Sequence, residues 1–208
     1  MARRSDHTRE ELKELAIQAA LALIEADGIG EFSARQVAAR IGYTVGTLYN
    51  IFDSYDELLL HVNARTLDGW YEFLQLRLAR SKSDPLRVLA RGYIDYARTN
   101  YNRWIALFEY RRTAAATFPD WYEQKLKRLF ALVEETILPQ AAQDHRKAKR
   151  AAQVLWAGIH GICVLSLSGR LELAGSDSPE AIAFSLIDNY LNGVKTNSPS
   201  GAGSQTAK

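Results

Sequence analysis

Apolar residues recur at three- and four-residue steps along most of the chain, which is the spacing of helices with one buried face. In the first helix this stripe consists of Leu12, Leu15, Ala16, Ala19, Leu23 and Ile24. The pattern predicts helices over residues 8–28, 33–42, 44–52, 54 to beyond 73, 84 to beyond 96, 102–111, 119–139, 146–171 and 179–194. No segment has the composition of a strand, so the predicted fold class is all-α.

Residues at the helix ends support these limits. Three of the predicted starts have the spacing of a capping box, in which a Ser or Thr side chain caps the helix and a Glu or Gln three residues later reaches back. They are Thr8–Glu11, Ser33–Gln36 and Ser54–Glu57. Asp84 and Ser178 each precede a proline at the first helical position, and Gly28 and Gly42 are suited to end helices.

The spacing of the elements predicts two domains and a tail. Three short, well-capped helices form a small helix–turn–helix domain over residues 1–56, and longer helices form a larger domain over residues 57–196. Residues 197–208 are small and polar, and we expect them to be disordered.

Composition narrows the possible chemistry. With 47 % hydrophobic residues the 208-residue chain can bury a core, while a net charge of +2 says little about partners. Cys163 is the only cysteine and the four histidines are far apart, so we expect no disulfide, no metal site and no cofactor. We find neither a signal peptide nor an apolar run of about 18 residues, and therefore expect a cytoplasmic protein.

The second and third helices have distinct inner and outer faces. The inner residues that would hold them together are Val37, Ala38, Ile41, Leu48 and Phe52. The outer residues without a core role are Arg35, Gln36, Thr44, Val45, Thr47, Tyr49 and Asn50. Gly46 lets the backbone approach a neighbour or a phosphate closely. Residues 32–52 contain Arg35 and Arg40 and no acid, and Arg3, Arg4 and Arg9 precede them, which indicates a small DNA-docking face.

The stretch "FSARQVAARIGYTVGTLYNIFDSYDELL" resembles the DNA-binding domain of TetR-family transcriptional regulators from about Thr8 to Leu60. Its core is Gly-Thr-Leu-Tyr-x-x-Phe at positions 46–52, followed by an acidic x-Glu-Leu-Leu. The resemblance implies a dimeric, ligand-responsive repressor. It places Ser33 and Arg35 at a phosphate or guanine edge, Thr44, Val45, Thr47 and Asn50 in the major groove, and Tyr43 and Tyr49 at phosphates.

Two positions depart from the family pattern. Val45 stands where a lysine or polar residue is common, and Asp53 stands where lysine is common. We expect the Asp53 carboxylate to repel phosphate and weaken the backbone contact, with the arginine arm compensating, and Val45 to contact a thymine methyl group. A protein–protein adaptor with weak DNA binding is therefore the alternative function.

Aromatic residues gather in the larger domain, where they form either a core or a ligand pocket. The candidate ligand-binding residues are Tyr93, Tyr96, Trp104, Phe108, Trp121, Phe130, Trp156 and His160. Trp156 and His160 are four residues apart and share a helix face, although a lone buried histidine is more often satisfied by a neighbouring side chain. The Trp-x-x-x-His-Gly run resembles a recurrent C-terminal class of TetR regulators. An aromatic or hydrophobic effector is expected.

The last two helices are apolar enough to require burial against a second chain. The candidate dimerisation residues are Leu155, Ile159, Ile162, Leu167, Ile182, Leu186 and Tyr190. A two-fold dimer would place two recognition helices about one DNA turn apart and require a near-palindromic operator. An enzyme is disfavoured, because His160 and Cys163 have no third orienting residue. No catalytic residue is predicted.

Overall fold

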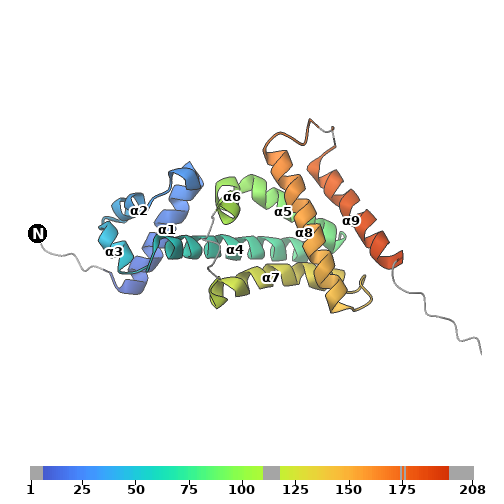
Figure 1. The fold of residues 1–208 in the computed structure, drawn as a ribbon, viewed down its shortest axis with the longest axis horizontal. Helices are drawn as coiled ribbons and strands as arrows, with labels where there is room; N and C mark the ends of the chain where they lie inside the picture. The colour runs from blue at the N-terminus through green and yellow to red at the C-terminus, as the bar shows by residue number, and fades with distance from the viewer. Residues whose placement is uncertain (1–6, 110–117, 174, 176, 197–208) are drawn as a thin grey trace, which may run out of the picture. The chain divides into compact units, whose positions relative to one another are not determined.

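The computed structural model describes residues 7–109, 118–173, 175 and 177–196, and these residues contain α-helices, one 3₁₀ turn and no strand (Figure 1). The all-α prediction is confirmed. The elements are α1 (Arg9–Asp27), η1 (Ile29–Glu31), α2 (Ala34–Ile41), α3 (Val45–Tyr49), α4 (Tyr55–Arg80), α5 (Pro85–Thr99), α6 (Tyr101–Glu109), α7 (Asp120–Ile137), α8 (His145–Leu167) and α9 (Pro179–Thr196). The arginine arm at Arg3 and Arg4 and the predicted tail lie outside the described residues.

The chain divides into two compact units. The first unit comprises residues 1–73 and 96–127, and the second comprises residues 74–95 and 128–208. The predicted boundary after residue 56 does not mark the edge of a unit. The reason is that the core beneath α1, α2 and α3 continues into Leu58, Leu59 and Val62 of α4 and Ala106 of α6.

Local capping explains most helix starts. Thr8 and Glu11 form the predicted reciprocal capping box, and Asp84 accepts the Arg87 amide at 3.0 Å before α5. At α4 the arrangement differs from the prediction, because the Glu57 carboxylate accepts the Asp53 amide at 2.6 Å while Ser54 caps the Glu57 amide at 3.1 Å.

Two predicted helix ends were wrong. The third helix stops at Tyr49 rather than residue 52, because the amides of Ile51 and Phe52 both turn back to the Leu48 carbonyl. The helix predicted over 146–171 ends at Leu167, just before Gly169 adopts a left-handed φ of 67°.

Helices α8 and α9 pack against each other in the second unit. A Cβ atom added at Gly158 would lie 2.4 Å from Leu186 Cδ2, so glycine permits the close approach of the two helices there. Gly161 has no such neighbour among the described residues. The buried core of this unit includes Leu86, Leu89, Ile94, Leu155, Ile159, Cys163, Ala183, Ile187 and Leu191.

Helix α8 is long and apolar enough to cross a membrane by length and composition alone, and it is the one such helix in the part of the chain that the structure describes. The expectation that no segment meets this criterion was therefore wrong. Core helices of folded domains meet the same criterion. Only 28 % of the most apolar window of α8 is buried within the single chain, which leaves an apolar face uncovered.

Candidate DNA-binding surface and effector sites

A three-residue turn joins α2 to α3. Gly42 adopts a left-handed conformation (φ 76°, ψ 25°), and its amide donates to the Ala39 carbonyl at 3.2 Å. The Tyr43 amide donates to the Ala38 carbonyl at 2.9 Å, which completes a Schellman motif. Thr44 then caps α3 by accepting the Thr47 amide at 3.2 Å. Glycine is required at position 42 because the φ is positive, and the turn fixes the direction in which α3 leaves α2.

The predicted inner face of this helix–turn–helix is confirmed. Val37, Ala38, Leu48 and Phe52 are no more than 2 % exposed, and Ile41 packs partly buried against the same core. Arg9 adds a further link, since its guanidinium donates to the Ile51 carbonyl at 3.4 Å. The start of α1 and the end of α3 are thereby tied together.

The predicted outer face is mostly exposed. Arg35, Gln36, Thr44, Tyr49 and Asn50 are exposed, and Thr47 is half-buried with its hydroxyl 3.0 Å from that of Thr44. These side chains expose hydrogen-bonding groups and the Arg35 charge, which suits contact with base edges and phosphates.

Three predicted DNA contacts have roles inside the protein as well. Ser33 caps α2 by accepting the Gln36 amide at 3.3 Å. Tyr43 is half-buried, and its hydroxyl lies 2.9 Å from Nδ1 of His7. Val45 is half-buried against the core of the first unit, so only part of its side chain remains for a thymine methyl group.

Gly46 has no steric reason to be glycine within the chain. A Cβ atom placed there would meet only the Thr44 hydroxyl oxygen, at the ordinary contact distance of 3.7 Å. Glycine inside a helix costs about 0.5–1 kcal/mol relative to alanine. The described chain therefore gives no steric reason for glycine at position 46, and the absence of a side chain leaves room for a DNA backbone to approach α3 closely.

The predicted ligand-binding residues divide between the two units. Tyr96, Trp104, Phe108 and Trp121 belong to the first unit. Tyr93, Phe130, Trp156 and His160 belong to the second.

In the second unit the four residues form one connected cluster. The Tyr93 hydroxyl lies 2.8 Å from Nδ1 of His160, Trp156 stacks on His160 with ring centroids 5.8 Å apart, and Phe130 meets Trp156 edge-on at 5.4 Å. The predicted shared face of Trp156 and His160 is confirmed, and the histidine is also satisfied by a neighbour, Tyr93. Partial burial lowers the pKa of His160, so its ring is neutral at neutral pH.

In the first unit, Asn63 on α4 is a polar residue that the sequence reasoning missed. Its side chain is 1 % exposed, and neither its amide nitrogen nor its oxygen has a hydrogen-bond partner among the described residues. Thr66 and Trp70 lie on the same helix face at i+3 and i+7, and Trp70 stacks on Tyr96 at 5.4 Å. The sequence feature that could have identified Asn63 is its position as a lone asparagine within an apolar run of α4.

Trp104 and Tyr96 are at most 4 % exposed in the first unit, and the Tyr96 hydroxyl donates to the Thr66 carbonyl at 3.1 Å. Phe108 meets Trp104 at 5.0 Å. Trp121 stacks on His61 at 4.7 Å and lines a hollow of about 270 Å³ among α1, α4 and α7. Tyr96 therefore contacts the helix face that carries Asn63, and Trp121 is linked through His61 to Phe52 of the helix–turn–helix core.

The predicted dimerisation residues need correction. Leu155 and Ile159 are 1 % and 8 % exposed within their own chain, because they form the core of the second unit, and so they cannot face a partner. Ile162, Leu167, Ile182, Leu186 and Tyr190 are half-buried. The exposed apolar side chains of α8 are Val154, Trp156, Val164 and Leu165.

Comparison with known proteins agrees with this architecture. Residues 16–62 match the model of the bacterial regulatory proteins of the tetR family, and residues 86–190 match that of the tetracyclin repressor-like C-terminal domain. Neither family description says whether the chain belongs to the C-terminal class that has the Trp-x-x-x-His-Gly run.

One curated relative is a transcriptional regulator, and a solved structure shares the fold. An uncharacterized HTH-type transcriptional regulator of Mycobacterium tuberculosis, Rv0681, is 24 % identical over 80 % of this chain and 75 % of its own length. A protein of unknown function from Rhodococcus sp. RHA1 has a similar fold, with a TM-score of 0.71, 18 % identity, and coverage of 92 % of this chain and 98 % of that one.

The regulator FadR of Bacillus subtilis, solved in complex with stearoyl-CoA, is similar with a TM-score of 0.63 and 15 % identity over 86 % of this chain and 98 % of its own.

The C-terminal family model alone covers half of the chain, and the N-terminal model covers the helix–turn–helix. This chain therefore belongs to the TetR family of transcriptional regulators.

Proposed function

We propose that this regulator is a cytoplasmic, homodimeric repressor that binds a near-palindromic operator through α2 and α3 and is released by a small hydrophobic or aromatic effector. The observation that carries the proposal is the outer face of α3. It is polar, free of acids over residues 32–52, and contains a helical glycine, Gly46, that the protein's own packing does not require.

The operator contacts follow from exposure and chemistry. Thr44, Thr47 and Asn50 read base edges in the major groove, with the exposed part of Val45 against a thymine methyl group. The residues that hold the phosphate backbone or adjacent edges are Arg3, Arg4, Ser33, Arg35, Gln36, Tyr43 and Tyr49. Phosphate contacts fix the register of the protein, whereas base contacts supply the specificity.

The dimer is proposed to form through the uncovered face of α8 together with α9. Val164 and Leu165 are exposed, and Ile162, Leu167, Ile182, Leu186 and Tyr190 are half-buried on the same two helices. Burying such a face against a second copy removes apolar surface from water and generates two-fold symmetry. A two-fold dimer presents two α3 helices and reads two inverted half-sites.

The effector is proposed to bind the aromatic groups of the C-terminal region. Tyr93, Phe130, Trp156 and His160 of the second unit offer an apolar surface with one neutral imidazole. Asn63 of the first unit offers a buried amide that has no hydrogen-bond partner among the described residues. That a protein of similar fold holds stearoyl-CoA supports an apolar ligand. The effector lowers operator affinity by preferring a conformer whose α3 helices are misplaced for the groove.

The alternative function is a protein–protein adaptor that has a helix–turn–helix but binds DNA weakly. It is favoured by Asp53, which is exposed beside the docking face, and by Val45, whose side chain is partly committed to the core. Selection of bound duplexes from a random DNA pool separates the two functions, because an adaptor enriches no sequence.

Asp53 provides a direct test of backbone contact. Replacing Asp53 by lysine removes a repulsive charge from the docking face and supplies a phosphate partner, so operator affinity should rise several-fold and the salt dependence should steepen by about one counterion per half-site. Gel-shift titration at several salt concentrations measures both effects. Glu31→Lys, at an exposed acid in η1 outside the helix–turn–helix face, is the matched control. Unchanged affinity and salt slope for Asp53→Lys would show that this side of α3 does not face phosphate.

A further inference from the structure

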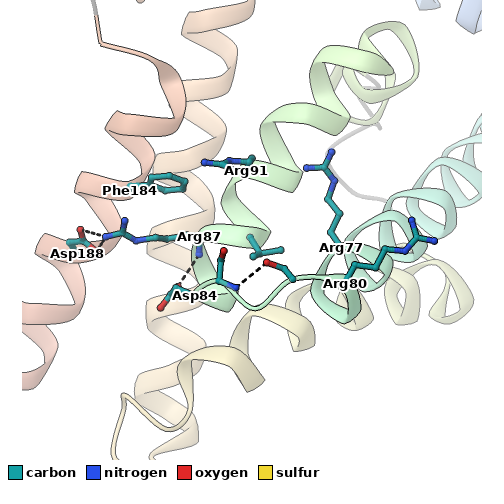
Figure 2. A pocket seen from close by; sticks show the side chains of 10 residues that line it. Arg77, Arg80, Asp84, Arg87, Arg91, Phe184 and Asp188 are labelled. Atoms are coloured by element: carbon teal, nitrogen blue, oxygen red, sulfur yellow. Dashed lines mark hydrogen bonds and ion pairs between the residues drawn. The ribbon is translucent and has the colours of Figure 1, made fainter.

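Four arginines gather around one hollow in the second unit. The hollow has a volume of about 790 Å³ and lies where the end of α4, the following turn and the start of α5 meet α9 (Figure 2). Its lining residues are Arg77, Arg80, Ser81, Ser83, Asp84, Arg87, Val88, Arg91, Phe184 and Asp188. None of them belongs to the aromatic groups proposed for the effector.

Carboxylates neutralise only two of these arginines. Arg87 donates to both oxygens of Asp188 at 3.0 and 2.7 Å, and Arg77 pairs with Asp95 at 2.5 Å. Among the described residues, no carboxylate lies within ion-pair distance of Arg80 or Arg91. When Asp95, the partner of Arg77, is counted with the lining residues Asp84 and Asp188, four arginines against three aspartates leave one positive charge in excess.

The arginines are partly pre-positioned. The guanidinium groups of Arg87 and Arg91 lie over the Phe184 ring, 5.1 and 5.5 Å from its centroid, and Figure 2 shows Arg91 beside Phe184 with Arg87 extended to Asp188. Asp84 is occupied in capping α5, where it accepts the Arg87 amide. Keeping like charges together costs free energy, and an anion that binds among them recovers that cost.

We propose that this hollow binds a small polyanion through clustered oxyanion groups, either phosphoryl groups or carboxylates. The planar guanidinium fork matches both kinds of group, and such charge-assisted hydrogen bonds are stronger than neutral ones. Arg80 and Arg91 make the primary contacts because they have no carboxylate partner to give up. The bound anion bridges the α4–α5 turn to α9 and stabilises the second unit. The proposal does not depend on operator binding.

Isothermal titration of the full-length protein tests this site, with inorganic pyrophosphate as the phosphoryl probe and citrate as the carboxylate probe at fixed ionic strength. The pocket variant is Arg80→Gln/Arg91→Gln, which leaves both ion pairs intact. The control is Arg146→Gln/Arg150→Gln, which removes the same charge from exposed positions on α8. We expect the pocket variant to bind about tenfold or more weakly and the control to bind within about twofold of the native protein.

The stronger of the two probes identifies the oxyanion class. Arg80→Gln alone, at an exposed position, serves as a second variant that keeps the contact of Arg91 with Phe184, and it should lose part of the affinity. Three results would overturn the proposal: no binding of either probe at millimolar concentration, equal affinity in the pocket variant, or an equal loss in the control.

Discussion

Replacing Gly46 by alanine should leave the protein as stable as the native chain or up to about 1 kcal/mol more stable, while operator affinity falls by about tenfold or more. Alanine favours the helix, and its Cβ atom meets only the Thr44 hydroxyl at 3.7 Å. The loss of affinity arises because the added methyl group projects from the recognition helix into the space that the DNA backbone or a base edge occupies. Urea unfolding measures the stability, and fluorescence anisotropy with an operator duplex measures the affinity.

Gly69→Ala is the matched control for this substitution. Gly69 lies within α4, and a Cβ atom there would also make one contact at 3.7 Å, with the Tyr96 hydroxyl. It should gain similar helix stability without any change in operator affinity. If Gly46→Ala bound the operator as tightly as the native protein, α3 would not approach DNA closely at this residue. If Gly46→Ala unfolded at a lower urea concentration than the native protein, the protein's own packing would require glycine at this position.

Replacing Asn63 by leucine should raise the free energy of unfolding by about 1–3 kcal/mol and abolish release of the operator by the effector. A buried amide without partners carries a desolvation penalty, and an apolar side chain of similar volume removes it. The effector loses the hydrogen bonds that the amide offers. Thermal-shift screening of aromatic compounds identifies the effector, and operator-release assays compare the variant with the native protein.

Thr66→Val is the matched control for Asn63→Leu, because it lies on the same buried face of α4. Its hydroxyl already donates to the Val62 carbonyl at 3.4 Å, so its removal should change stability by less and leave the effector response intact. Loss of stability in Asn63→Leu together with an unchanged effector response would show that the amide serves the core instead of a ligand.

The helix–turn–helix could be predicted from sequence because its determinants are local. Capping side chains, a glycine that must adopt a positive φ at position 42, and alternating inner and outer residues all act within a few positions of one another. The inner residues of α2 and α3 were accordingly identified correctly.

Prediction failed where tertiary packing decides exposure. Leu15 was placed on the buried stripe of α1 but is 40 % exposed, whereas Ile17 and Leu21 are buried, because α1 packs against both α2 and α6 and so buries a different and wider face. Leu155 and Ile159 were assigned to a dimer although α9 and the rest of the second unit already cover them. Periodicity shows that a helix has an apolar face but not which neighbour covers it.

The arginine hollow of the second unit was even less accessible to sequence reasoning. The arginines of the α4–α5 region are spread over 15 positions, from Arg77 to Arg91, and resemble an ordinary solvated charge pattern. The fold brings them to one hollow with Asp188, about 100 positions away along the chain.

Selection of bound duplexes from a random DNA pool by the full-length protein tests the central claim most directly, that α2 and α3 read a two-fold operator. The account predicts enrichment of an inverted repeat whose half-sites are about one helical turn apart or slightly more, bound by a dimer in light scattering. Arg35→Ala and Asn50→Ala should weaken binding to it, whereas Arg150→Gln should not. An unenriched pool, or a monomer that binds an asymmetric site, would contradict the account.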